Sequence, residues 1–85
     1  MKKTDQITLE NAVVGFRYVI DDISINSGSL LFRLYDFGIV NEATITPLFK
    51  SMFTGCTAYD VNGCVVSLRD SDANKIHVKR YIDKG

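Results

Sequence analysis

The chain has 85 residues, of which 46% are apolar and 11% aromatic, and its ten basic residues balance ten acidic ones. This length allows one domain with one core and leaves little room for an active-site cleft. A neutral chain also lacks the positive field that draws proteins to nucleic acid or anionic lipid. We therefore expect a single domain over residues 1–85 that binds no nucleic acid.

The first residues, MKKTDQITLE, contain no apolar stretch of the length that a signal peptide needs. No run elsewhere approaches the roughly 20 apolar residues that cross a bilayer. These features predict a cytoplasmic protein that does not insert into a membrane and reaches one only through a partner.

The N-terminal part of the chain predicts a short lead-in and then a strand. Residues 6–14 are a structured lead-in that ends at Gly15, a residue that suits a turn. Apolar and polar residues then alternate within residues 16–25, and this period of two favours a strand.

The period changes in the next segment, which predicts a helix over residues 29–37. Ser and Asn residues in front of it are typical helix starts, because their side-chain oxygens accept hydrogen bonds from first-turn amides. Leu30, Leu34 and Phe37 fall on one helical face, which we expect to be buried. Gly38 follows, where a left-handed stop is common.

Residues 44–50 predict a strand that contains Pro47, which has no N–H for a sheet ladder. We therefore expect this strand to have an edge or a bulge there. The loop that follows, residues 51–55, carries Met52 and Phe53 where polar residues are usual. These two side chains either fold back onto the core or form an exposed apolar knob for a partner.

The clearest local signal is Asn62-Gly63, which best tolerates the two positive φ angles of a type I′ hairpin turn. Such a turn fixes the register of the flanking strands. The facing pairs are Val61 with Cys64, Tyr59 with Val66, Thr57 with Leu68, and Cys56 with Arg69. This register predicts an apolar core face that includes the Cys64 sulfur, and it places the two cysteines too far apart for a disulfide.

After the hairpin, residues 69–74 predict a polar turn, with one helical turn capped by Asp70 or Ser71. Residues 76–80 then alternate as a last strand. The whole chain is thus mainly all-β, with about five short strands and one short α-helix, and such strands usually close into a barrel.

The sequence offers no set of residues for catalysis. His77 is the only histidine, and its neighbours predict a side chain that faces solvent and not a metal ligand. A nucleophilic Cys64 would need an exposed thiolate, and the glycines do not form a phosphate-binding motif. We expect a binding module that is not an enzyme and carries neither cofactor nor metal site.

Several short motifs nevertheless occur in a specific order and spacing. They are FRLYDFGI at 32–39, AYDVNG at 58–63, LR at 68–69 and DANKIHV at 72–78. In this order the chain, from about residue 7 to 81, resembles the FeoA family, ferrous iron transport protein A.

The resemblance implies a small SH3-like β-barrel in the cytoplasm that works with FeoB, a membrane iron transporter with a GTPase domain. The chain departs from the family at Asn41-Glu42, where a Pro-Gly pair is common. Because Asn adopts the left-handed conformation and Glu resists it, we expect a different turn type there.

The residues proposed for partner binding are Tyr35, Met52, Phe53, Arg33 and Arg69. Tyr35 lies off the apolar helical face. Arg33, Arg69 and the nearby Asp36 are either recognition charges or members of a structural ion pair or cap, and the second interpretation is favoured.

Three hypotheses follow. The first is an accessory protein that docks on the cytoplasmic part of FeoB and modulates it. The second is a metal sensor or carrier that binds iron through His77, a cysteine and nearby carboxylates. The third is a module that self-associates weakly through the Met52-Phe53 loop.

Overall fold

The computed structural model of the chain describes residues 6–82. Residues 1–5 and 83–85 lie outside it, and with them Lys2, Lys3 and Lys84 and half of the segment MKKTDQITLE. The elements follow in the order β1 (Ile7–Thr8), a 3₁₀ turn (Leu9–Asn11), β2 (Tyr18–Ile23), α1 (Gly28–Asp36), β3 (Thr44–Lys50), β4 (Cys56–Val61), β5 (Cys64–Arg69), α2 (Asp70–Ala73) and β6 (Ile76–Arg80).

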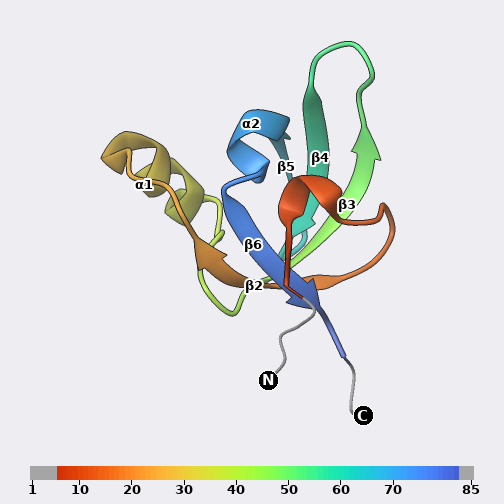
Figure 1. The fold of residues 1–85 in the computed structure, drawn as a ribbon, viewed down its shortest axis with the longest axis horizontal. Coiled ribbons are helices and arrows are strands. Elements are labelled where there is room, and N and C mark those ends of the chain that lie inside the picture. The colour runs from red at the N-terminus through yellow and green to blue at the C-terminus, as the bar shows by residue number, and fades with distance from the viewer. Residues whose placement is uncertain (1–5, 83–85) are drawn as a thin grey trace.

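The strands form one six-stranded antiparallel sheet in the order β1-β6-β2-β3-β4-β5 (Figure 1). This confirms the predicted class, a small and mainly β fold with one short α-helix. The sheet has one strand more than expected, the two-residue β1 of the lead-in. Its two outer strands do not pair within residues 6–82, so the sheet is not closed by hydrogen bonds.

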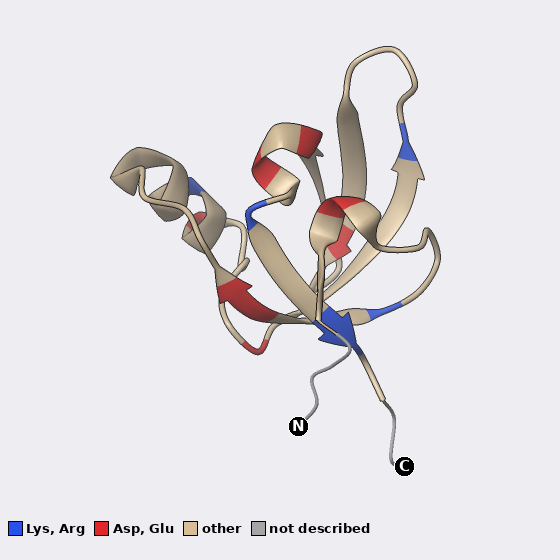
Figure 2. Ribbon diagram, viewed as in Figure 1, with Lys and Arg blue, Asp and Glu red and all other residues tan. Residues whose placement is uncertain are grey.

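The hydrophobic core contains residues from nearly every element. Its fully buried side chains include Tyr18, Ile20, Leu34, Ile45 and Tyr59. Basic and acidic positions are interspersed along the ribbon (Figure 2). Neither helix in residues 6–82 is long and apolar enough to cross a membrane.

The β4–β5 hairpin confirms the predicted register at all four pairs. Asn62 has a φ of 54° and Gly63 a φ of 90°, the two positive angles that a type I′ turn requires. The turn residues therefore account for the observed register.

Helix α1 begins one residue before the predicted helix, and the Ser27 Oγ accepts a hydrogen bond from the Leu30 N–H at 3.5 Å. Gly38 has a φ of 86° and ends the helix as expected. Leu34 is buried, but Phe37 is 41% exposed, so its predicted burial is wrong. Phe37 follows the last helical residue, where the chain turns away.

Strand β3 has the predicted bounds, and Pro47 lies at a bulge. The ladder with β4 shifts between Pro47 and Phe49. The ring of Pro47 is fully buried, and its carbonyl accepts a hydrogen bond from the Gly15 N–H at 2.8 Å. The bulge accommodates the missing N–H without loss of the strand.

The turn between α1 and β3 differs from the expectation for Asn41-Glu42. Glu42, not Asn41, has the positive φ, 78°, and the Ala43 N–H donates to the Val40 carbonyl at 3.1 Å. A positive φ at the third position of a four-residue turn is the geometry of a type II turn, the type that Pro-Gly favours. The prediction of a different turn type was wrong. The backbone forms the type II turn with Glu42 at the third position, where the positive φ is a strained conformation for a residue with a Cβ.

The polar turn after β5 contains the expected single helical turn, α2. Arg69 occupies the cap position and makes no side-chain capping bond, so the prediction of a cap by Asp70 or Ser71 is wrong. Asp70 lies inside the first turn, and its Oδ1 accepts a hydrogen bond from the Thr57 hydroxyl at 3.1 Å. This bond ties α2 to β4.

Candidate docking site

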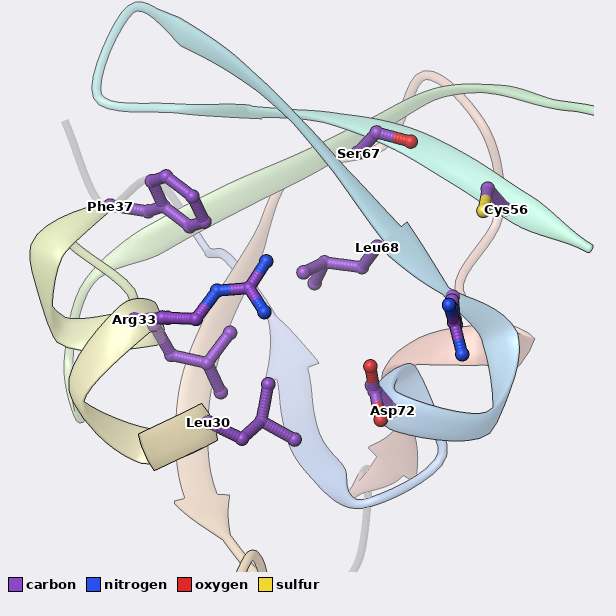
Figure 3. A pocket seen from close by; sticks show the side chains of 9 residues that line it. Leu30, Arg33, Phe37, Cys56, Ser67, Leu68 and Asp72 are labelled. Carbon is purple, nitrogen blue, oxygen red and sulfur yellow. The ribbon is translucent and has the colours of Figure 1, made fainter. Parts of the chain in front are cut away.

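A pocket of about 360 Å³ lies between α1, β5 and α2, and we call it the helix–hairpin pocket (Figure 3). It is lined by Leu30, Arg33, Leu34, Phe37, Cys56, Ser67, Leu68, Arg69 and Asp72. Its floor is aliphatic and its rim is charged. This combination suits the binding of a side chain with an apolar body and a polar end.

One wall of the pocket comes from the spacing of residues on α1. Leu30, Arg33, Leu34 and Phe37 follow the i, i+3, i+4, i+7 pattern that places residues on one helical face. Figure 3 shows the Arg33 guanidinium pointing from this helix into the pocket toward Leu68. The helix therefore presents a charge directly above its own leucines.

The opposite wall comes from the end of the β4–β5 hairpin and from α2. Arg69 is the last residue of β5, and the next residue is fixed by its backbone, because the Asp70 N–H donates to the Gly55 carbonyl at 2.8 Å. Asp72 projects from α2 on the side of the pocket that faces Arg33 (Figure 3). The backbone that carries the two charged residues of this wall, Arg69 and Asp72, is thus held in place.

Two of the five predicted partner-binding residues, Arg33 and Arg69, therefore meet in one pocket. The favoured interpretation, a structural ion pair or cap, finds no partner for them within residues 6–82. The one ion pair in that part of the chain joins Lys79 Nζ to Asp21 Oδ1 at 3.6 Å. Asp36 and Arg33 both line a neighbouring hollow, but Asp36 forms no ion pair within residues 6–82.

Met52 and Phe53 lie at the tip of the β3–β4 hairpin, which extends beyond the rest of the fold (Figure 1). Met52 is 91% exposed and Phe53 98%, so these side chains form an apolar knob and do not fold back. The Ser51 Oγ accepts hydrogen bonds from the Phe53 N–H at 3.3 Å and the Thr54 N–H at 3.2 Å. The knob is therefore held in shape by its own loop.

Tyr35 lies elsewhere, and the structure does not bring it into the helix–hairpin pocket. It is 47% exposed and borders a separate hollow with Leu31, Val40 and Ile23. The five predicted residues therefore fall into three places on the surface.

The prediction that the Cys64 sulfur lies in the core is wrong, because Cys64 is exposed. The register fixes which residue Cys64 faces, but not how far the core extends along β5: Val66 and Leu68 are buried, whereas Cys64, the first residue of the strand, is not. In the order of the sheet, β2, β3 and β4 lie between β5 and the strand that carries His77. Both cysteines are free thiols, as expected.

His77 is half-buried, so its predicted exposure to solvent is also wrong. The two-residue β1 pairs with β6 and sets Thr8 opposite His77, and the buried His77 Nδ1 has no hydrogen-bond partner in the part of the chain that the structure describes. Within residues 6–82, no three His, Cys, Asp or Glu residues gather to hold a metal ion. The metal-sensor hypothesis therefore finds no ligand set there.

Tyr59 is a buried titratable group on β4. Burial raises the pKa of this phenol to about 12, and the Asp70 and Glu10 carboxylates add to the increase, while the Thr57 hydroxyl opposes it. Among residues 6–82 the Tyr59 hydroxyl has no partner at hydrogen-bonding distance. It therefore stays protonated at neutral pH and acts as part of the core.

Sequence reasoning missed several residues of the pocket. Leu30 and Phe37 were assigned to the core, and Asp72 to a solvated turn. The available signal was an arginine, Arg33, placed between Leu30 and Leu34 on one helical face. This pattern indicates a charged side chain beside an apolar helical face. It does not show that β5 and α2 form the other wall of the pocket.

Comparison with known structures supports the fold. The chain is similar to the FeoA protein from Chlorobium tepidum, with 22% identity, a TM-score of 0.82, and coverage of 93% of this chain and 75% of that one. It is also similar to a FeoA-like protein from Clostridium acetobutylicum, with 23% identity, a TM-score of 0.77, and coverage of 98% and 95%. No match was found among curated proteins.

The same fold occurs inside larger proteins. A manganese-dependent transcriptional repressor is 19% identical with a TM-score of 0.83, and the match covers 93% of this chain but only 43% of the repressor. At these identities the likenesses establish the fold alone. The family model of the FeoA domain, however, matches residues 7–80, almost the whole chain. The chain therefore belongs to the FeoA family of small proteins associated with ferrous iron transport.

Proposed function

We propose that this protein is a cytoplasmic accessory protein of ferrous iron uptake that docks on the cytoplasmic part of FeoB and modulates the transporter. The observation that carries the proposal is the FeoA domain over residues 7–80. It associates the chain with iron transport, while the surface offers features for binding another protein.

The exposed knob supports docking. A Met and a Phe that are almost fully exposed at the end of a hairpin lose contact with water only when a partner covers them. Phe and Met are both enriched at the buried centres of protein interfaces. The ordered loop also lowers the entropy that binding would cost.

A binding assay tests the proposal. The purified chain is titrated into the cytoplasmic part of the FeoB from the same organism, with GTP analogue or GDP bound, at physiological salt. We expect association, and we expect Met52→Ser/Phe53→Ser to weaken it by about tenfold or more. Absence of binding in both nucleotide states would refute docking.

The same knob supports a second candidate function, weak self-association. In this case the wild-type chain would sediment with a concentration-dependent mass, and Met52→Ser/Phe53→Ser would sediment as a monomer. A wild-type chain that stays monomeric at high concentration, yet binds FeoB, would reject self-association and retain docking.

A further inference from the structure

The helix–hairpin pocket contains two guanidinium groups that lack an acidic partner within residues 6–82. Neither Arg33 nor Arg69 takes part in an ion pair or a side-chain hydrogen bond there. The one ion pair in those residues joins Lys79 to Asp21, and neither of these lines the pocket. Guanidinium groups have five N–H donors in a planar fork that matches a carboxylate. The pocket therefore holds unused donors of one specific geometry.

The floor beneath these donors is apolar. Leu30 and Leu34 from α1 meet Leu68 from β5, and Figure 3 shows the Leu30, Leu68 and Arg33 side chains pointing into the same space. A volume of about 360 Å³ lies at the low end of ligand pockets. It has room for one large side chain and an acidic group beside it.

Asp72 restricts where an acidic group can bind. It lies on α2, across the pocket from Arg33 (Figure 3). A carboxylate would approach the Arg33 side and would be repelled from the Asp72 side. The lining therefore favours a single acidic group next to an apolar one over a run of acidic residues.

We infer that this pocket binds a segment of the partner protein in which an Asp or Glu adjoins a large aliphatic or aromatic residue. The carboxylate accepts hydrogen bonds from Arg33 and Arg69, and the neighbouring side chain packs on Leu30 and Phe37, the apolar residues of the lining that are not already buried. The inference rests on the proposed function, because it names the chemistry by which the partner is recognised. It assigns the pocket a role separate from that of the Met52-Phe53 knob.

Charge reversal tests the inference in the same titration with the cytoplasmic part of FeoB. We expect Arg33→Glu and Arg69→Glu each to weaken binding by about tenfold or more, because a repulsive pair replaces an attractive one. Arg17→Glu makes the same charge change outside the pocket lining and is expected to stay within about threefold of wild type. Arg33→Lys keeps the charge without the fork and should fall between wild type and Arg33→Glu.

Circular dichroism and denaturant unfolding first establish that each variant is folded. A rescue experiment then identifies the partner residue: acidic residues of the FeoB part are changed one at a time to Arg, and one change should restore binding of Arg33→Glu. If wild type binds and both charge reversals bind equally well, the inference is overturned while docking stands. If wild type does not bind, docking itself fails, and the assignment of this partner fails with it.

Discussion

The two hairpins that share strand β4 differ in how their residues fit their structure. In the β4–β5 hairpin the turn residues are those that the turn geometry requires, and Val61, Tyr59 and Leu68 are buried. In the β3–β4 hairpin the loop carries Met52 and Phe53 into solvent. Folding explains the turn and the buried face of the first hairpin and leaves the apolar tip of the second without an explanation. The comparison separates residues that build the fold from residues available for binding.

A matched pair of leucines tests this division most strongly. Leu68 on β5 is 5% exposed, whereas Leu48 on β3 is 37% exposed. We expect Leu68→Ala to lower the free energy of unfolding by about 3 kcal/mol, because it removes buried methyl groups and leaves a cavity. Leu48→Ala should cost less than about 1 kcal/mol. Denaturant unfolding measures both, and similar losses would show that β3 is packed as tightly as β5.

Tyr59 on the shared strand gives the second largest effect. Its pKa of about 12 lies above the ordinary value of 10, so both folded and unfolded states are protonated below pH 10. Between pH 10 and 12 the unfolded state releases the proton and the folded state retains it. The free energy of unfolding should therefore fall as pH rises through this window, by about 2 kcal/mol.

Tyr59→Phe provides the control, since the other tyrosines are unchanged in it. The difference in stability between wild type and Tyr59→Phe should change across this window and be constant below it. At neutral pH the variant should be as stable as wild type or more stable by about 1 kcal/mol, because it removes an unpartnered buried hydroxyl. Parallel pH curves for the two proteins would argue against a buried neutral phenol.

The turn that leads into β3 offers a smaller effect of the opposite sign. Glu42 has a φ of 78°, a conformation that costs a residue with a Cβ about 1–2 kcal/mol. Glu42→Gly should raise the free energy of unfolding by about 1 kcal/mol, after the greater freedom of glycine in the unfolded chain is subtracted. Glu42→Ala keeps the strain and should show no comparable gain. Equal stability of the two variants would indicate that the turn is not strained.

The same contrast explains how much the sequence could reveal. The β4–β5 register follows from Asn62-Gly63, and the ends of α1 follow from Ser27 and Gly38, because these effects act within a few residues. The burial of Cys64 could not be predicted in the same way. Cys64 is exposed although Val66 and Leu68 on the same strand are buried, because burial depends on where other elements pack over the strand, and that is decided by the whole chain.

The candidate site shows the same limit. Arg33 and Arg69 were both identified as candidate residues, but nothing local indicates that α1 packs beside the end of β5. The alternative of an ion pair was reasonable from sequence, since Asp36 and Asp72 are near in the chain. Only the fold shows that, within residues 6–82, neither acid is paired with either arginine.

The smallest expected effect on stability belongs to the knob. Met52→Ser/Phe53→Ser should leave the free energy of unfolding within about 0.5 kcal/mol of wild type, because both side chains are already in solvent. The hydrogen bonds of the loop use Ser51 and Thr54 and persist in the variant. Thermal or denaturant unfolding measures this directly, with Leu68→Ala as the control for a buried residue. A clear loss of stability would mean that the knob contributes to the fold, and a weakened FeoB interaction in this variant would then no longer identify a contact surface.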